Sequence, residues 1–389
     1  MTKRVAVIGA YCTKFGELWE KSLSDLLFES SLGALRDAKI TGSSLDAIVT
    51  GNMCSGMLGA QLQLGALASS LLHVSCPSVV VEATCASGAM AVYVGIEKIL
   101  SGNADVVLVH GVEKMTDHDG AFITQTLMSG AHAETELMIG ATFPAINAMI
   151  ARLYMHTYGI TKEHLAAVSV YSHKNAVHNS IAHFKKEISL SDVVSSEMVA
   201  DPLSVFDCAP ISDGAASIVL CSERYAKSHG YNPVFIVGWG SATDTVALAS
   251  RSSLLSCNAN RLAAQKAYAM AGITSDDIDV AEVHDAFSIT HVMALEDLGF
   301  YKEGKAGFVF EEILAGKKPR VVSNPSGGLK ARGHPAGASG VAQVCEIYWQ
   351  LQGSAGQRQV ADVRYGLTQS MGGCGTNSVV HILSKGEQL

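Results

Sequence analysis

Cys85-Ala-Ser-Gly-Ala89 and His334-Pro-Ala-Gly-Ala338 are the two stretches that decide how this chain is organised. An apolar helical segment follows each of them, ending at Glu97 in the first case and at Glu346 in the second. The same offset of 249 residues separates Cys85 from His334 and Glu97 from Glu346. A repeated pattern at a fixed offset predicts that the chain consists of two related halves.

Three more pairs of matching segments occur in the same order in both parts of the sequence. They are Val5–Gly9 with Val234–Gly238, Ile40–Asp46 with Ile273–Asp279, and Ala104–Val106 with Ala361–Val363. Each match is short, but the shared order favours duplication over coincidence. Two similar halves packed about a pseudo-twofold axis would bring equivalent loops together at the centre. We therefore expect Cys85 and His334 to share one site.

The composition places limits on the class of protein. The chain has 389 residues, of which 48% are hydrophobic and 16% charged, enough for two ordinary domains with full cores. A net charge of −8 and a sequence pI of about 5.9 give no electrostatic case for a nucleic-acid partner. The mean hydropathy of +0.24 is high, yet no run of ~18 apolar residues occurs, so we expect no membrane span.

The cysteines indicate a compartment. Nine cysteines are scattered along the chain without a CxxC pair, which is not a disulfide framework. The first residues run directly into a strand pattern at Val5, and no signal peptide fits them. These features predict a reducing intracellular location, the cytoplasm or the mitochondrial matrix, and not secretion.

Short β-branched runs alternate with helical patterns, which predicts an α/β fold built from βαβ units. Strands are expected at or near Val5–Ile8, Ile48-Val49, Val79–Val81, Val106–Val109, Ser217–Leu220, Val234–Val237, Val280–Val283, Val321-Val322 and Ser378–Ile382. Helices are expected at Leu23–Ala38, after Cys85, at Arg261–Ala271 and at Gly340–Leu351.

The domain boundaries follow from this pattern. Residues 1–116 and 201–228 form the predicted N-terminal half, and residues 229–389 form the C-terminal half. Residues 117–200 are a long insertion that we interpret as a lid or substrate loop, because insertions of this length are usually functional.

Cys85 is the candidate nucleophile. It stands between an apolar strand and a helix start of small residues, where the helix dipole and free N–H groups would lower the pKa of a thiol. Its backbone N–H could also face an oxyanion. The alternative is a buried structural cysteine, the usual state of free cysteine. The duplication favours the nucleophile.

The segment 324–340 is rich in glycine and contains His334 and two cations, Lys330 and Arg332. His334 precedes a proline that suits a first helical turn, so it could act as a base toward Cys85. Lys330 and Arg332 are candidate ligands for a phosphorylated cofactor, although they could equally be solvated. A phosphate-binding loop is the alternative reading, but the GxxxxGK[ST] pattern is absent.

Two further loops contribute candidates. His284 follows a strand in Glu-Val-His-Asp-Ala-Phe287 and could donate a hydrogen bond to a thioester oxygen, or could be merely structural. In the loop Thr368–Gly375, glycine N–H groups could complete an oxyanion hole. Cys374 in this loop is either a second acid/base or small filler, and we favour filler.

Two weaker signals complete the candidates. Ser212 is expected near the pocket as a cofactor-binding residue. His173, His178 and His183 recur every five residues, which is not the i,i+4 spacing of a helical metal pair, so no metal site is expected.

Together these loops resemble the thiolase superfamily over nearly the whole chain. Glu82–Gly88 is similar to the nucleophile loop, and Gly327–Gly340 to the glycine-histidine-proline loop. His284–Phe287 stands where many thiolases read Asn-Glu-Ala-Phe. The His-Asp pair is similar to that of the thiolase fused to sterol carrier protein and of archaeal acetoacetyl-CoA thiolases.

The resemblance implies a thiolase fold, duplicated βαβ halves in a five-layered αβαβα arrangement with an inserted loop domain. It implies CoA thioesters as substrates without a permanently bound cofactor, and a homodimer or homotetramer, with a complex with another lipid-synthesis enzyme as a further option. It also implies that Cys85 is acylated and that His334 activates it. His284 and His334 would bind the thioester oxygen, and the N–H groups of Cys85 and Gly372 would form a second oxyanion hole.

The chain departs from the family at the second catalytic cysteine. The two places where thiolases carry it read Gln369-Ser370 and Ala286 here. General acid–base help is worth about 10²–10⁴ in rate, so ordinary thiolysis loses support. The remaining Cys85, His284 and His334 are similar to the Cys-His-His set of decarboxylating β-ketoacyl synthases, which suggests malonyl-CoA as a donor. A CoA-thioester-binding scaffold with little turnover is the alternative to the enzyme.

Overall fold

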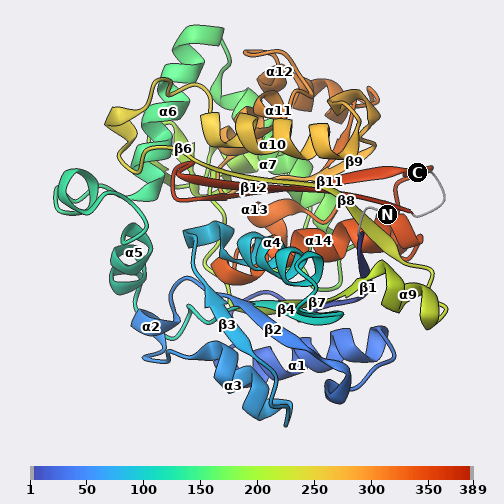
Figure 1. Ribbon diagram of the computed structural model, residues 1–389. Helices are drawn as coiled ribbons and strands as arrows, with labels where there is room; N and C mark the ends of the chain where they lie inside the picture. The colour runs from blue at the N-terminus through green and yellow to red at the C-terminus, as the bar shows by residue number, and fades with distance from the viewer. Residues whose placement is uncertain (1–3, 386–389) are drawn as a thin grey trace.

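The computed structural model describes residues 4–385 and shows two similar five-stranded units (Figure 1). The strands of the first half are β1 (Val5–Cys12), β2 (Ala47–Gly51), β3 (Ser78–Val81), β4 (Val106–Glu113) and β7 (Gly214–Ser222). Those of the second are β8 (Val234–Thr243), β9 (Val280–Glu282), β10 (Val322–Ser323), β11 (Tyr365–Gly372) and β12 (Asn377–Lys385).

Strand order confirms the duplication. Hydrogen bonds connect the strands in the order β10-β9-β11-β12-β8-β1-β7-β4-β2-β3, so each half repeats the other in reverse. β2 is parallel to β3 and β4, and β9 is parallel to β10 and β11. The two halves join where Val5–Val7 of β1 pair antiparallel with Val234–Ile236 of β8.

Helices complete the layers seen in Figure 1. The first half contributes α1 (Leu23–Asp37), α2 (Ser55–Leu58), α3 (Leu64–Leu71), α4 (Ser87–Leu100) and α9 (Glu223–Ser228). The second contributes α10 (Asn258–Ala271), α11 (Ser288–Asp297), α12 (Ala306–Leu314), α13 (Gly328–Arg332) and α14 (Ala336–Gln352). α4 and α14 lie between the two strand layers, while α1 and α3 cover one outer face and α10 to α12 lie on the other. The result is the expected αβαβα order.

A pair of aspartates explains one of the sequence matches. The Asp46 carboxylate accepts hydrogen bonds from the backbone N–H groups of Asp105 and Val106, at 2.8 and 2.9 Å. Asp279 does the same for Arg364 and Tyr365, at 2.8 and 3.1 Å. Each aspartate therefore ties the entry of β2 or β9 to the start of the neighbouring parallel strand. The repeated residue has the same structural task in both halves.

The central helices cross closely because both begin with small residues. A Cβ atom added to Gly88 of α4 would lie 2.4 Å from the carbonyl oxygen of Gly337 in α14. One added to Gly340 would lie 2.3 Å from the backbone nitrogen of Ala89. Such distances exclude any side chain without a backbone shift. This crossing brings the starts of the two helices, and hence Cys85 and His334, to one place.

The insertion is mostly helical, with α5 (Gly120–Met128), a π-helical turn (Ala133–Leu137), α6 (Phe143–Tyr158), α7 (Lys162–Ala176), α8 (Leu190–Val194) and β5 (Met198–Ala200), after which β6 (Leu203–Ser204) pairs with β5. α7 packs against α12 and α13 of the second half. Although the insertion leaves the chain after β4, much of it therefore packs on the C-terminal half.

One element was not expected. The segment that we interpreted as a glycine-rich loop from Thr368 is strand β11 up to Gly372, and only the residues that follow form a turn. The match between Ala104–Val106 and Ala361–Val363 already contained this signal, since the first of these leads directly into β4. The isolated polar residues Thr368, Gln369 and Ser370 concealed a strand that is buried on both faces. No helix among residues 4–385 has the length and hydropathy to cross a membrane.

Candidate active site

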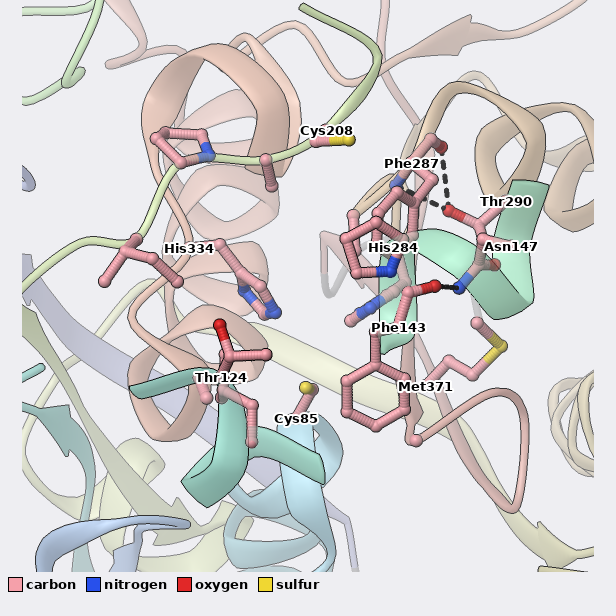
Figure 2. Close-up of a pocket in the computed structure, with 18 of the residues that line it drawn as sticks. Cys85, Thr124, Phe143, Asn147, Cys208, His284, Phe287, Thr290, His334 and Met371 are labelled. Atoms are coloured by element: carbon pink, nitrogen blue, oxygen red, sulfur yellow. Dashed lines mark hydrogen bonds between the residues drawn. The ribbon is translucent and has the colours of Figure 1, made fainter. Parts of the chain in front are cut away.

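A cavity of about 280 Å³ is lined by residues of both halves and of the insertion. Cys85, His284 and His334 all line it, and Figure 2 shows the Cys85 sulfur and both imidazoles facing the same space. The ring centroids of His284 and His334 are 5.3 Å apart, with the rings perpendicular. The structure thus brings together three side chains that are 50 to 249 positions apart in sequence.

A strained turn presents Cys85. Thr84–Ala86 form a 3₁₀ turn ahead of α4, and Thr84 has a φ of +51°, which is unusual for a β-branched residue. The Ser87 hydroxyl locks the turn, because it accepts from the N–H of Ala83 at 2.9 Å and donates to the carbonyl of Thr84 at 2.6 Å. The turn holds the sulfur at the cavity instead of inside the helix.

The thiol of Cys85 is not acidic in the empty site. Burial raises the pKa of Cys85 to about 12, and the nearby Glu113 carboxyl adds to this shift. Backbone N–H groups of Gly373 and of Cys85 itself act in the opposite direction but do not prevail. The expectation that the helix start lowers the pKa of this thiol is therefore wrong for the free protein. A base must take the proton as the sulfur attacks.

Alkylation of Cys85 should consequently depend steeply on pH. Below a pKa of about 12 the thiolate fraction rises tenfold per pH unit, so the rate with iodoacetamide should rise by about that factor per unit between pH 7 and 9. Peptide mass spectrometry after timed quenching measures the rate at Cys85 alone. A rate that is high at pH 7 and flat above it would instead show a preformed thiolate.

The hydrogen bonds of His334 make it a base toward the cavity. Its Nδ1 lies 2.7 Å from the Ser339 hydroxyl, which donates its own proton to the carbonyl of Pro335 at 2.9 Å. Ser339 must then accept from Nδ1–H, which leaves the Nε2 lone pair free. Burial, His284 and Arg332 hold the pKa of His334 well below its usual value, so the imidazole is neutral. A neutral imidazole can accept the Cys85 proton.

Strand β11, which the sequence did not predict, holds His284 in place. Its backbone N–H donates to the side-chain oxygen of Gln369 at 2.9 Å, and Gln369 in turn donates to Asn260 at 2.8 Å. Burial lowers the pKa of His284 to about 3, so this ring is also neutral. Gln369, which stands near the place of the missing second cysteine, therefore positions His284.

Gly373, and not Gly372, is the glycine of this turn that contributes to the cavity lining. Gly373 lines the cavity and its N–H faces Cys85, while Gly372, the glycine that we expected there, packs against the nucleophile turn. A Cβ on Gly372 would lie 2.2 Å from Thr84 Oγ1. Gly372 thus allows the close approach of β11, and the candidate oxyanion donor moves by one residue.

Burial contradicts the three cofactor-binding residues that we expected. Lys330 and Arg332 are each 1% exposed, and Ser212 is fully buried. Lys330 donates to the Ser288 hydroxyl at 3.0 Å, and Arg332 pairs with Glu282 at 3.2 Å. The Ser212 hydroxyl accepts from the backbone N–H of His334 at 3.2 Å. All three support the walls of the site from behind and leave no free face for a phosphate.

Cys374 does not line the cavity; its sulfur contacts the Asn147 amide at 3.9 Å. This position agrees with the interpretation of Cys374 as filler. Among residues 4–385 no group of three or more side chains could hold a metal ion. His173, one of the three histidines spaced five residues apart, stacks on Phe184.

Glu113 is a residue beside the site that no sequence motif indicated. It is fully buried at the end of β4 and accepts N–H bonds from Met53, Cys54 and Gly337, and one from the Asn52 amide. Burial raises the pKa of Glu113 to about 7 despite these donors. Glu113 links the first half to the helix that follows His334. An acidic residue at the end of an apolar strand was the only available signal.

Acyl transfer requires a nucleophile, a base and hydrogen-bond donors for an oxyanion. The buried thiol, the two neutral imidazoles and the convergent N–H groups supply these parts. Comparisons with known proteins agree. Residues 5–224 match the family model "Thiolase, N-terminal domain", and residues 240–385 match "Thiolase C-terminal domain-like". The chain belongs to the thiolase family, and it is an acyltransferase that uses CoA thioesters.

Individual proteins similar to this chain fall into the archaeal and sterol-carrier groups of the family. An acetyl-CoA acetyltransferase of Methanothermobacter thermautotrophicus is 44% identical over 98% of this chain and 99% of its own. Sterol carrier protein 2 of Bos taurus is 34% identical over 76% of this chain and 57% of its own. A solved structure described as an Ltp2-ChsH2(DUF35) aldolase has a TM-score of 0.84 at 24% identity, covering 99% of this chain and 98% of its own. The resemblance to archaeal and sterol-carrier-type thiolases is confirmed.

Proposed function

We propose that this enzyme makes or cleaves short 3-oxoacyl-CoA thioesters by Claisen condensation or thiolysis, through an acyl-Cys85 intermediate. The convergence of Cys85, His284 and His334 on one cavity carries this proposal. The relatives named acetyl-CoA acetyltransferase support acetyl-CoA and acetoacetyl-CoA as substrates. Lipid or sterol-precursor metabolism is the setting that this chemistry suits.

In thiolysis, His334 Nε2 takes the proton of Cys85 while the sulfur attacks the 3-oxo carbon of the substrate. The tetrahedral oxyanion accepts hydrogen bonds from the N–H groups of Cys85 and Gly373. Its collapse breaks the C2–C3 bond and leaves the acyl group on Cys85. The electron pair goes to C2 of the departing acyl-CoA enolate, which then takes the proton from the His334 imidazolium.

The second half-reaction reverses the proton path. The thiol of free CoA gives its proton to His334 and attacks the acyl-Cys85 carbonyl, and Cys85 leaves as a thiolate that recovers the proton. One base serves both steps, so no second cysteine is needed. His284 remains neutral and supplies an N–H to the enolate oxygen, a role that fits its pKa of about 3.

A decarboxylating reaction is the second candidate. Ala286 lines the cavity where some thiolases carry their second cysteine, and Cys374 lies outside the lining. Loss of CO₂ from malonyl-CoA would generate the carbanion without any base. Decarboxylation with malonyl-CoA as donor thus suits a Cys-His-His site.

The decisive experiment follows both the reaction and the intermediate. The purified protein is incubated with acetoacetyl-CoA without free CoA, and the intact mass and the Cys85 peptide are analysed. An added acetyl group on Cys85, together with CoA-dependent thiolysis, supports the proposal. Release of CO₂ from malonyl-CoA without thiolysis would establish the decarboxylating alternative. Binding of CoA thioesters without either reaction would make the protein a scaffold.

Assembly and location belong to the same proposal. We propose a homodimer or homotetramer, and a complex with a second protein. The solved neighbour whose description includes a DUF35 component makes a DUF35-type protein a concrete partner to test. All nine cysteines are free, which suits a reducing compartment. The archaeal relatives support the cytoplasm and give no support to the mitochondrial matrix.

A further inference from the structure

The cavity extends well beyond the three catalytic side chains. Much of its lining is apolar and includes Met115, Leu127, Met128, Phe143 and Met371. Figure 2 shows Phe143 beside the Cys85 sulfur and Met371 beyond Phe143, whereas Cys208 lies at the opposite end of the space. An acyl group attached to Cys85 would therefore extend among apolar side chains.

The polar side chains of this wall have partners inside the protein. The Thr124 hydroxyl donates to the Gly120 carbonyl at 2.7 Å, and the Thr290 hydroxyl donates to the Phe287 carbonyl at 2.8 Å. The Asn147 amide donates to the Phe143 carbonyl at 2.9 Å. No free donor is left to these groups for recognising a polar acyl chain. The wall is suited to a hydrocarbon.

The volume exceeds what an acetyl group needs. A water molecule occupies about 30 Å³ in the liquid, so about nine would fill a cavity of 280 Å³. An acetyl group contains three non-hydrogen atoms. An acetyl group on Cys85 would therefore leave much of this space empty. Empty apolar space costs the packing contacts that a longer chain would supply.

We propose that the preferred acyl group on Cys85 is an unbranched chain of about four carbons, the group that 3-oxohexanoyl-CoA delivers. This inference rests on the proposed function and specifies its substrate class. Three methionines suit such a chain, since their flexible thioethers adapt to chains of different length. Each buried methylene raises kcat/KM by about fourfold when its burial is realised in the transition state. Two extra methylenes should therefore favour 3-oxohexanoyl-CoA over acetoacetyl-CoA by about fifteenfold.

The test is a chain-length series with matched variants. Thiolysis of acetoacetyl-, 3-oxohexanoyl- and 3-oxooctanoyl-CoA is measured with the wild type and with Leu127→Trp, Phe143→Ala and Leu262→Trp. Leu127→Trp places an indole in the cavity and reduces its volume. The ratio of kcat/KM for 3-oxohexanoyl-CoA to kcat/KM for acetoacetyl-CoA should then fall to about one. Phe143→Ala enlarges the cavity, so 3-oxooctanoyl-CoA should become the substrate with the highest kcat/KM. Leu262 lies 38% exposed on α10, so Leu262→Trp controls for an added indole and should keep the wild-type preference.

The outcomes separate the two proposals. Wild-type thiolysis that is fastest with acetoacetyl-CoA would overturn the chain-length inference and leave the proposed function intact. Absence of thiolysis and of any Cys85 adduct with all three substrates would overturn the proposed function, and the inference with it. Because Leu127→Trp and Phe143→Ala shift the preference in opposite directions, misfolding of one variant leaves the other as a test.

Discussion

Replacing Cys85 by alanine should lower thiolysis by at least about 10⁴-fold, because loss of a nucleophile removes the covalent route entirely. The structure gives no substitute: Cys374 lies outside the cavity lining, and Cys208 lies at the far end of the space from Cys85. The change also removes a buried thiol of high pKa without breaking a charge pair. Binding of CoA thioesters should persist, which calorimetry can measure separately from turnover.

The matched control for this variant is Cys76→Ser. Cys76 is half-buried ahead of β3 and does not line the cavity, so its replacement should leave the thiolysis rate unchanged within error. A Cys85→Ala variant that keeps more than about a tenth of the wild-type rate would contradict the covalent mechanism. Such a result would point to direct transfer between bound thioesters.

Arg332→Met should be the most destabilising single change near the site. Arg332 and Glu282 are each at most 1% exposed and pair at 3.2 Å, with the Ser326 hydroxyl donating to Glu282 at 2.7 Å. Removing one partner of a buried pair leaves the other charge uncompensated, at a cost of about 3 kcal/mol. Denaturant unfolding of wild type and variant should show this loss in the free energy of unfolding.

The deficit should depend on pH in a defined direction. Burial raises the pKa of Glu282 to about 7 even though Arg332 opposes this shift, so the pKa should be higher still in Arg332→Met. A carboxyl whose folded pKa exceeds its unfolded value costs stability as pH rises through that folded pKa. The variant should therefore be weaker at pH 8 than at pH 6. Neutralising the orphaned carboxyl in Arg332→Met/Glu282→Gln should recover part of the loss.

An exposed pair provides the control. Lys317 and Glu312 lie 2.8 Å apart with side chains 66% and 50% exposed, and such pairs contribute little. Lys317→Met should leave the unfolding midpoint unchanged within error. If Arg332→Met also left the free energy of unfolding unchanged, the buried pair would not be what joins β9, the strand before His284, to α13. Another contact would then have to stabilise this wall of the site.

The internal sequence repeat allowed most of the fold to be predicted from the sequence. Asp46 and Asp279 could be matched because each performs the same local task, capping the start of a neighbouring strand. Cys85 and His334 could be paired because each stands at the start of a small-residue helix, and such helices can cross closely. Strand β11 was missed because its polar residues are buried by contacts that lie far away in sequence, such as the bond from Gln369 to Asn260.

The sequence by itself determined the two halves, the thiol and the imidazoles, because these depend on residue type and on local spacing. Only the tertiary structure decided which groups face the cavity. Lys330, Arg332 and Ser212 are polar and adjacent to His334, yet they point into the protein. Tertiary burial also reversed the expected shift of the Cys85 pKa. Exposure and desolvation depend on what packs around a residue, and for this chain those neighbours come from the other half and from the insertion.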